Sequence, residues 1–415
     1  MELKRVVVTG LGAITPLGKT IDEFWINLVN GVSGAATITR FDPTNFKTKF
    51  ACEVKDFDPL AYFDKKEAKK LDMFAQFAVI AAEQAVNDAA FDLEVLDKDR
   101  VGVVWGAGIG GLNTFLEEVT SYVKGGGIPR YNPFFIPKMI ADIAAGHISI
   151  KYGFRGPNFG TVAACASSTN AIADAYNLIR LGKADVFIAG GSEATINEAG
   201  IGGFNALQAL STRNDDPTTA SRPFDKGRDG FVMGEGGAGI ILEEYEHAKK
   251  RGAKIYCEMV GSGMSADAYH ITAPHPEGLG AINVMKAALS DNNIKIEEVD
   301  YINVHGTSTP LGDIAETKAI ISVFGEHAYN LNISSTKSMT GHLLGAAGAI
   351  EAIACILAIK HQIVPPTINH FELDDAIDPR LNLTFNVAQK RKVRVALTNT
   401  FGFGGHNASA LFRAL

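Results

Sequence analysis

Thr161-Val-Ala-Ala-Cys-Ala-Ser-Ser-Thr-Asn170 joins a short extended run to an amphipathic helix through a turn of small residues. The helix is predicted over Ser167–Leu181, because apolar residues recur there at helical spacing and Gly182 follows as a terminator. Side chains from Ser167 to Asn170 are suited to capping its N-terminus. The next apolar run, Asp185–Ala189, ends in two glycines and predicts a buried strand. Strand, turn, helix and strand in this order indicate α/β architecture.

The second half of the chain repeats this pattern of elements. The matching segments are Arg5–Thr9 with Gly10–Gly18 and Lys254–Val260 with Gly261–Ser265, Arg100–Trp105 with Gly106–Gly111 and Val299–Val304 with His305–Gly312, Ser167–Leu181 and His342–Lys360, and Asp185–Ala189 and Val393–Thr398. The pattern predicts two halves of βαβαβ type, residues 1-253 and 254-415, whose functional loops meet at a pseudo-twofold axis. The alternative is that α/β proteins look self-similar without any duplication.

Length and composition describe an ordinary globular protein of 415 residues with 46% hydrophobic and 20% charged residues. A formal net charge of −7 argues against general nucleic-acid binding, which needs clustered positive charge. The longest apolar stretch, Leu343–Ile359, contains Glu351 and predicts a buried core helix, not a membrane span. The N-terminus lacks the features of a signal peptide, and we expect a cytoplasmic protein.

Four cysteines stand far apart, without CxxC pairs or zinc-ligand spacing, so no metal site is expected. Cys165 lies at or just before a predicted helix N-terminus, where backbone N–H groups and the macrodipole favour an anion. Such positions lower the pKa of a thiol and create a nucleophile. The competing interpretation is a small buried hydrophobe, which we prefer for Cys52, Cys257 and Cys355.

Two histidines have settings suited to assisting a nucleophilic cysteine. His305 follows an apolar strand, at the end where α/β sheets place ligands. His342 lies at the predicted start of the second half's long helix, pseudo-equivalent to the position of Cys165, and is expected to be neutral there. Lys337 and Glu351 lie near it in the sequence. Each histidine alone is more often structural, and the convergence of three positions favours a catalytic site.

Glycine-rich segments admit two different functions. Gly10-Leu-Gly-Ala-Ile-Thr15 imitates a dinucleotide fingerprint but lacks its third glycine, so nucleotide binding is disfavoured. The segment from Thr400 to Asn407 contains Phe401 and Phe403 between glycines. It is a candidate oxyanion hole, because glycines expose backbone N–H groups, and its aromatic rings are either core residues or a gate.

The chain resembles the elongating β-ketoacyl-[acyl-carrier-protein] synthases of bacterial fatty acid synthesis, which have a thiolase-like fold with α/β/α/β/α layers. The resemblance covers essentially the whole chain. Its motifs are Val6-Val-Val-Thr-Gly-Leu-Gly12, Ala164-Cys-Ala-Ser-Ser168, Gly190-Gly-Ser-Glu193, Arg222-Pro-Phe-Asp225, Arg228-Asp-Gly-Phe-Val-Met-Gly-Glu-Gly236, His305-Gly-Thr-Ser-Thr309, Lys337-Ser-Met-Thr-Gly-His342 and Phe401-Gly-Phe-Gly-Gly405.

This resemblance implies a decarboxylating condensation of acyl and malonyl groups on acyl carrier protein, of the synthase II type. Cys165 would carry the acyl group, and His305 and His342 would hydrogen-bond the malonyl thioester carbonyl. Lys337 is also a catalytic candidate, and with Glu351 it would form the polar surroundings that orient His342. The remaining implied roles are an oxyanion hole at the N–H groups of Cys165 and Phe403, an acyl pocket and gate of Ile109, Phe204, Phe401 and Phe403, and pantetheine contacts at Thr272, Thr307 and Thr309.

Acyl carrier protein is acidic, so an acidic enzyme needs local positive charge to bind it. We expect this docking surface at Lys65, Lys66, Lys69, Lys70, Arg130 and Arg213, although an ordinary solvated helix face is an equal alternative. The resemblance also implies a homodimer and no metal or redox cofactor. His406 stands where many members have threonine, and we expect it to play a supporting role.

Several related functions fit the sequence less well. A thiolase would need a second cysteine near Phe401–Asn407, and priming synthases have Asn where His342 stands. A non-catalytic chain-length partner would lack Cys165. A polyketide-type ketosynthase of the same mechanism and, from another class, a subunit that binds acyl chains without chemistry remain as alternatives.

Overall fold

The computed structural model describes residues 3–415. The first half contributes five long strands, β1 (Val6–Ile14), β4 (Val101–Gly106), β5 (Asn158–Thr161), β6 (Val186–Glu193) and β7 (Gly236–Glu244), and a small pair, β2 (Ala36–Thr37) and β3 (Phe50–Ala51). Its helices are α1 (Ile21–Val29), α2 (Lys65–Ala68), α3 (Met73–Ala89), α4 (Leu112–Lys124), α5 (Phe135–Met139), α6 (Ile143–Tyr152), α7 (Ser167–Arg180), α8 (Glu198–Ala206) and α9 (Tyr245–Lys250).

The second half contributes β8 (Cys257–Ala266), β9 (Val299–Asn303), β10 (Asn332–Ser334), β13 (Val395–Gly402) and β14 (His406–Arg413), and a small pair, β11 (Ile363–Val364) and β12 (Gln389–Lys390). Its helices are α10 (Leu279–Ser290), α11 (Pro310–Phe324), α12 (Lys337–Thr340) and α13 (Ala347–His361). Short 3-10 turns are η1 (Pro59–Ala61), η2 (Lys98–Arg100), η3 (Pro217–Thr219), η4 (Ile296–Glu298), η5 (Gly325–Asn330) and η6 (Leu344–Ala346).

Both halves have the same strand topology, which confirms the predicted duplication of the fold. The order is β5-β4-β6-β7-β1 in the first half and β10-β9-β13-β14-β8 in the second, so each runs third, second, fourth, fifth, first. The two five-stranded units form one hydrogen-bonded sheet because Val6, Val7 and Val8 of β1 pair with Met259, Glu258 and Cys257 of β8. The predicted boundary at residue 253 lies in the connection between α9 and β8.

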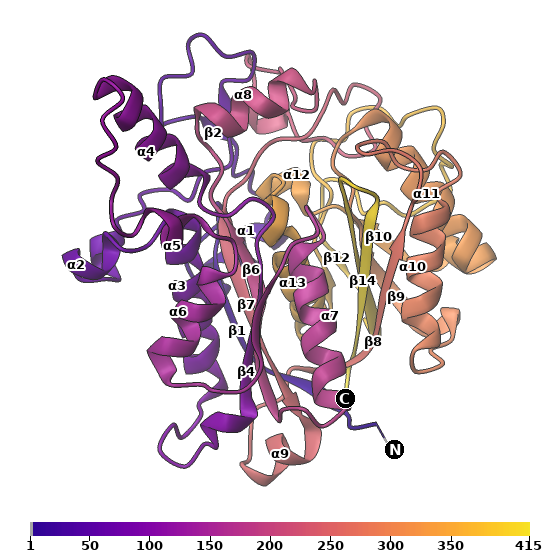
Figure 1. The fold of residues 1–415 in the computed structure, drawn as a ribbon. Helices are drawn as coiled ribbons and strands as arrows, with labels where there is room; N and C mark the ends of the chain where they lie inside the picture. Colours follow the sequence, from indigo (N-terminus) through magenta and orange to yellow (C-terminus); the bar gives the residue numbers. More distant parts are fainter. Residues whose placement is uncertain (1–2) are drawn as a thin grey trace.

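Helices form three layers around the two halves of the sheet, giving the predicted α/β/α/β/α order (Figure 1). The long helices α7 and α13 pack between the halves and share one core with strands of both. α3 and α6 cover the outer face of the first half, and α10 and α11 cover that of the second. Because the sheet is covered on both faces, β1 and β4 are buried along their whole length, as their continuous apolar sequences require.

The glycines that follow the predicted segments Arg5–Thr9 and Lys254–Val260 lie within β1 and β8 and not beyond the ends of these strands. β1 continues through Gly10 and Gly12, whose added Cβ atoms would come within 2.2 Å of Ala85 O and 2.0 Å of Ala81 O in α3. Gly261 and Gly263 of β8 stand in the same relation to α10. These glycines therefore let a helix approach the strand closely, and the approach is itself duplicated.

The second long helix begins at Ala347 and not at His342, which corrects the predicted range His342–Lys360. Leu344 has a φ of 48°, outside the right-handed helical region, and η6 intervenes. The stretch Leu344–His361 is long and apolar enough to cross a membrane, yet 89% of it is buried inside the protein. Burial between the sheet halves accounts for its composition.

Candidate active site

Cys165 lies at the tip of a strained turn between β5 and α7. Ala164 has a φ of 49°, a left-handed conformation that costs a non-glycine residue about 1–3 kcal/mol. The Ser167 hydroxyl holds this turn, since it accepts a hydrogen bond from Ala163 N at 2.9 Å and donates to Ala164 O at 2.6 Å. Ala166 is the N-cap and makes no side-chain cap, so the predicted capping by residues 167–170 is wrong.

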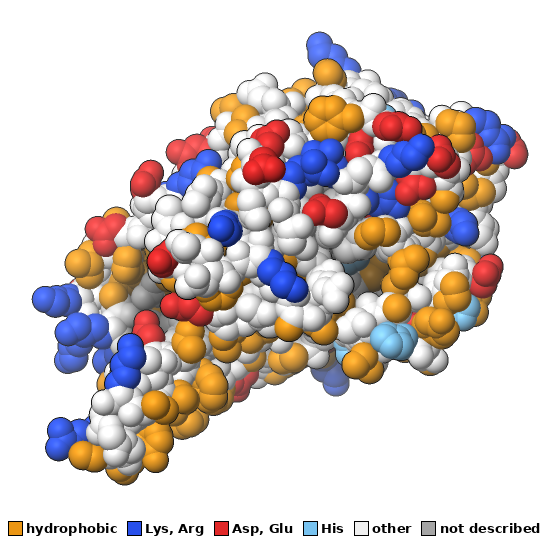
Figure 2. Space-filling view, turned by 90° about the horizontal axis from the view of Figure 1, so that it is seen from above, with side chains coloured by type: hydrophobic (Ala, Val, Ile, Leu, Met, Phe, Trp, Pro, Cys, Tyr) orange, Lys and Arg blue, Asp and Glu red, His pale blue; other side chains and the backbone are white. Residues whose placement is uncertain are grey.

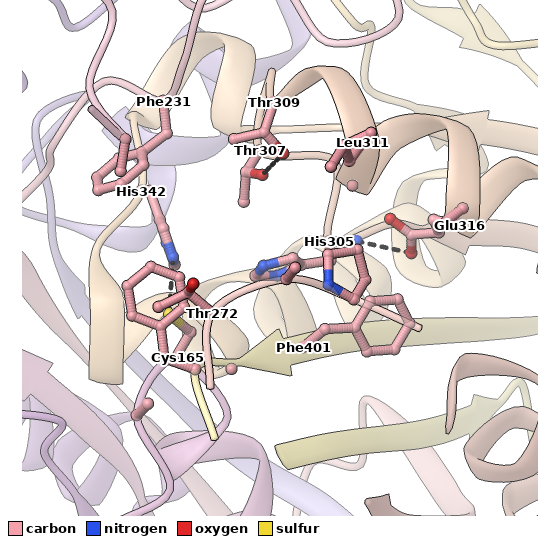
Figure 3. A pocket seen from close by; sticks show the side chains of 18 of the residues that line it. Cys165, Phe231, Thr272, His305, Thr307, Thr309, Leu311, Glu316, His342 and Phe401 are labelled. Atoms are coloured by element: carbon pink, nitrogen blue, oxygen red, sulfur yellow. Dashed lines mark hydrogen bonds between the residues drawn. The ribbon is translucent and has the colours of Figure 1, made fainter. Parts of the chain in front are cut away.

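His342 Nε2 lies 3.0 Å from Cys165 Sγ (Figure 3). The histidine follows Gly341 in the segment between α12 and η6, and its N–H donates to Val232 O at 2.7 Å. The ring of Phe231 meets the imidazole edge-on, with centroids 5.3 Å apart. Backbone pairing and aromatic packing therefore fix the ring against the sulfur.

His305 lies in the loop after β9 and faces the same space. Its ring is almost perpendicular to that of His342, with centroids 5.4 Å apart and an interplanar angle of 87°. The Glu316 carboxylate holds the loop by accepting from His305 N and Gly306 N, both at 2.9 Å (Figure 3). Sequence reasoning missed Glu316. Its only signal is a carboxylate on the apolar face of α11.

Burial lowers the pKa of His305 and His342 well below the ordinary value, and the positive charge of Lys337 lowers it further. Both rings are therefore neutral near pH 7, and each carries one N–H donor. The predicted neutrality of His342 is confirmed, but its cause is different, because α13 begins five residues later. Desolvation and a nearby cation, not a helix N-terminus, keep the imidazoles uncharged.

Burial raises the pKa of the Cys165 thiol to about 12, so the predicted lowering is wrong. The thiol opens only onto a cavity, and the low polarity around it disfavours the thiolate. Lys337 and the backbone N–H groups of Phe403 and Cys165 favour the anion and counteract part of this effect. The N–H groups of the predicted oxyanion hole thus lie at the sulfur, although they do not make the free thiol acidic.

Phe403 approaches the nucleophile because glycine precedes it. A Cβ atom on Gly402 would stand 2.8 Å from Ala163 O and 3.0 Å from Cys165 N. The end of β13 therefore lies against the strained turn only in the absence of a side chain at Gly402.

Lys337 and Glu351 form a buried ion pair joined by a hydrogen bond, and each is 1% exposed. Burial raises the pKa of Glu351 to about 7, and Lys337 opposes the rise. Neither side chain hydrogen-bonds to His342, whose Nδ1 has no hydrogen-bond partner among residues 3–415. Lys337 therefore acts on the histidines through its charge and not through contact.

One cavity of about 530 Å³ brings together three of the four predicted catalytic residues and the predicted acyl and pantetheine residues, but not Lys337. Those that line it are Cys165, His305, His342, Ile109, Phe204, Phe401, Phe403, Thr272, Thr307 and Thr309, whereas Lys337 and Glu351 lie behind the wall. The Thr307 and Thr309 hydroxyls at its wall face each other and are 3.0 Å apart (Figure 3). Among residues 3–415, no group of three or more His, Cys, Asp and Glu side chains is placed to hold a metal ion.

The predicted docking residues lie outside the cavity wall. Lys65, Lys66 and Lys69 are exposed on or next to α2, and blue side chains gather on that side of the molecule in Figure 2. Lys70 is half-buried over the Phe134 ring, with Nζ 5.5 Å from the ring centroid. Of the two arginines, Arg130 is exposed, and Arg213 is half-buried and donates from Nη2 to Gly227 O at 2.9 Å.

His406 is the first residue of β14 and lies outside the cavity lining. Its exposed ring packs over the backbone of Gly404, where an added Cβ would stand 2.8 Å from Nε2. The supporting role of His406 stays a prediction.

Known proteins resemble this chain along its whole length. Residues 3–248 match the N-terminal domain of β-ketoacyl synthases, and residues 256–371 match their C-terminal domain. The 3-oxoacyl-[acyl-carrier-protein] synthase 2 of Synechocystis sp. is 53% identical over 415 residues, 100% of this chain and 99% of that protein. The protein of the same name from Coxiella burnetii is 49% identical over 409 residues, with 99% and 98% covered.

Solved structures give the same result. A β-ketoacyl synthase from Burkholderia phymatum superposes with a TM-score of 0.92 at 36% identity, covering 99% of this chain and 100% of that one. A ketosynthase bound to a hexaketide, solved in complex with its type II PKS acyl-carrier protein, superposes with a TM-score of 0.91 at 36% identity, with both chains fully covered. Together with the cysteine and the two histidines at one cavity, these matches show that the chain belongs to the β-ketoacyl synthase family.

Proposed function

We propose that this protein condenses acyl-[acyl-carrier protein] with malonyl-[acyl-carrier protein], giving 3-oxoacyl-[acyl-carrier protein], carbon dioxide and free carrier protein in fatty acid elongation. The observation that carries the proposal is the contact of 3.0 Å between Cys165 Sγ and His342 Nε2, with His305 at the same cavity. Relatives named 3-oxoacyl-[acyl-carrier-protein] synthase 2, at 47–53% identity, support this reaction type.

In the first step the Cys165 sulfur attacks the thioester carbon of the acyl donor. The new carbon–sulfur bond forms as the bond to the carrier's thiol breaks, and the proton of Cys165 passes to that leaving thiolate. The tetrahedral oxyanion accepts hydrogen bonds from the N–H groups of Cys165 and Phe403. One such donor is typically worth about 2.7–4 kcal/mol in the transition state. Because burial disfavours the thiolate in the free enzyme, the two N–H donors stabilise the oxyanion of the reacting complex more than they stabilise the resting state.

In the second step neutral His305 and His342 donate hydrogen bonds to the thioester carbonyl of the malonyl group. Carbon dioxide leaves, and its bonding electrons remain as an enolate that the two donors stabilise. The enolate carbon attacks the acyl-Cys165 carbonyl, so a carbon–carbon bond forms and the carbon–sulfur bond breaks, and the Cys165 thiolate that leaves takes up a proton from solvent to restore the thiol. Neutral donors suit this step because they stabilise the developing charge without first taking a proton from another group.

The cavity wall supports two further roles. Ile109, Phe204 and Phe401 would surround the acyl chain. Phe403 would act as the gate, since it lines the cavity and its ring centroid lies 6.2 Å from that of Phe204. Thr272, Thr307 and Thr309 would contact the pantetheine arm, which carries polar groups that hydroxyls can bind. Lys337 would lower the pKa of His342 from behind the wall, and Glu351 would hold Lys337 there through their buried ion pair.

Acyl carrier protein would dock at Lys65, Lys66, Lys69, Lys70, Arg130 and Arg213, with no cofactor beyond its own pantetheine. The exposed lysines next to α2 support this proposal, and a related ketosynthase has been solved with its carrier protein. Arg213 is the weakest member, because its contact with Gly227 O already uses one of its donors. We place the protein in the cytoplasm, where carrier-bound substrates occur.

We further propose a homodimer. β5 is the edge strand of the sheet and is only half-buried, and Val162 directly after it is 64% exposed. Phe115 of α4 and Ile136 of α5 also expose apolar surface. Proteins normally cover such edges and patches, and a second copy of the chain would do so. Light scattering should give about twice the chain mass of 44.2 kDa. A single chain mass would refute the dimer.

The catalytic proposal is tested by Cys165→Ala and Cys165→Gln with malonyl- and acyl-carrier protein. The first should abolish condensation, and the second should retain malonyl decarboxylation because both histidines remain. Full condensation by Cys165→Ala would overturn the mechanism. Acyl binding without any condensation by the unaltered protein would favour a non-catalytic acyl-binding subunit.

A polyketide-type ketosynthase of the same mechanism is the second candidate, since a type II PKS ketosynthase has the same fold at 36% identity. The higher identity of the fatty acid relatives favours elongation. Mass spectrometry of products from a series of acyl-carrier-protein donors separates the two. Unreduced chains extended repeatedly by malonyl units would indicate the polyketide reaction.

A further inference from the structure

Glu193, the last residue of β6, is fully buried next to the active site. Within residues 3–415 its carboxylate pairs with no Lys or Arg side chain, and it is satisfied by backbone N–H groups instead. The donors are Gly108 N at 2.8 Å, Ile109 N at 3.2 Å, Gly110 N at 3.0 Å and Gly345 N at 3.1 Å. No step of the proposed reaction uses this carboxylate.

The four donors belong to segments from different halves of the protein. Gly108, Ile109 and Gly110 connect β4 to α4, whereas Gly345 lies in η6. The segments touch only because glycines meet, since a Cβ atom on Gly345 would stand 2.1 Å from Gly108 N. A Cβ on Gly108 would stand 2.8 Å from the Glu193 carboxylate and 3.2 Å from Ala164 O, directly before the nucleophile.

Both segments carry parts of the proposed reaction centre. The Ile109 side chain is 42% exposed, and it lines the cavity beside Cys165. Gly345 follows His342 by three residues, in the turn that directly precedes the second long helix. A shift of either segment on the carboxylate would therefore move the cavity wall relative to the histidine.

We infer that Glu193 is a positioning residue that clamps the cavity wall at Gly108–Gly110 to the turn carrying His342, and so sets which acyl chains fit. This inference deepens the proposed function and rests on it. A carboxylate suits the position because it accepts through both oxygens and donates through neither. An amide of the same shape would turn its NH2 group toward converging N–H donors. Burial raises the Glu193 pKa to about 7 and the four donors lower it, so the backbone supports the charge in place of a cation.

The test compares Glu193→Gln with Glu235→Gln, which replaces another buried carboxylate that lies outside the cavity lining. The assay measures kcat/KM for acyl-carrier-protein donors from short to long. Glu193→Gln should change the ratio of long-chain to short-chain kcat/KM by about tenfold, the lower end of what an altered hydrophobic pocket produces. Glu235→Gln should leave that ratio unchanged. Glu193→Asp, which keeps the charge but shortens its reach, should give an intermediate ratio.

An equal loss at every chain length in Glu193→Gln would mean a purely structural role and would overturn the inference. Hydrogen exchange of the unaltered protein gives a second test that needs no variant. A shared clamp predicts that the amides of Gly108, Ile109, Gly110 and Gly345 exchange in a single opening event. Release of Gly345 independently of the other three would also refute the clamp. If the unaltered protein condenses no donor, the proposed function fails, while the exchange experiment still tests the clamp.

Discussion

Replacing Lys337 by methionine should destabilise the protein and shift the pH dependence of catalysis. The substitution keeps an unbranched side chain but removes the cation that pairs with Glu351, and both positions are 1% exposed. Removing one partner of a buried ion pair typically costs about 3–5 kcal/mol, because the other charge is left buried and unpaired. A loss of 3 kcal/mol lowers the folding equilibrium constant by roughly 150-fold.

The size of the loss should depend on pH. Glu351 already has a pKa raised by burial to about 7, and losing Lys337 raises it further. A carboxyl whose folded pKa lies above its unfolded pKa contributes stability at low pH that is lost as pH rises through the folded value. Urea unfolding of Lys337→Met should therefore show the full loss near pH 9 and a smaller one near pH 6. The double variant Lys337→Met/Glu351→Gln should recover most of the lost free energy of unfolding, since it leaves no unpaired charge at these two buried positions.

Catalysis gives an independent measure of the same charge. Lys337 lowers the pKa of His305 and His342, so its removal should raise both and move the acid limb of the decarboxylation rate to higher pH. Lys226→Met is the control, because it breaks only exposed ion pairs with Glu372 and Asp375, and exposed pairs contribute little to stability. Unchanged unfolding at pH 9 together with an unmoved acid limb would show that neither Glu351 nor the histidines feel the Lys337 charge.

Three further predictions concern the nucleophile, the gate and the docking surface. Because burial raises the Cys165 pKa to about 12, its alkylation rate should rise by about tenfold per pH unit from pH 7 to pH 9. A plateau in that range would contradict the raised pKa. Phe403→Ala should change the acylation rates of short and long acyl donors by different factors, as rapid-quench measurements can establish, and acylation rates unchanged from those of the unaltered protein at every chain length would exclude a gate. Charge reversal at Lys65 and Lys69 should raise the KM for carrier protein but not for a free acyl thioester, and an unaltered KM would move the docking surface elsewhere.

The sequence was sufficient to predict the elements that depend on local pattern. The repeated apolar strands predicted the two halves, and the small residues around Cys165 predicted a turn before a helix. Both hold because buried parallel strands and tight turns restrict which residues they accept.

The features that sequence reasoning missed depend on contacts between distant segments. The long helix begins at Ala347 because the preceding turn packs glycine to glycine against the loop after β4. The pKa of Cys165 is raised because the assembled cavity removes it from water, which no local motif describes. Glu193 was visible as part of a motif, but its four backbone donors come together only in the folded chain.

The burial of α13 also has a consequence for folding while the chain is being synthesised. Its apolar surface is covered by strands of both halves, and two of these, β13 and β14, follow α13 in the chain and are synthesised after it. Until they are made, a stretch hydrophobic enough for a lipid bilayer has no complete cover. Because synthesis runs from the N-terminus, only α7 and strands made earlier can cover the apolar surface of α13 until the second half is complete. Through the central helix layer, the two halves depend on each other for folding during synthesis as well as for the proposed reaction.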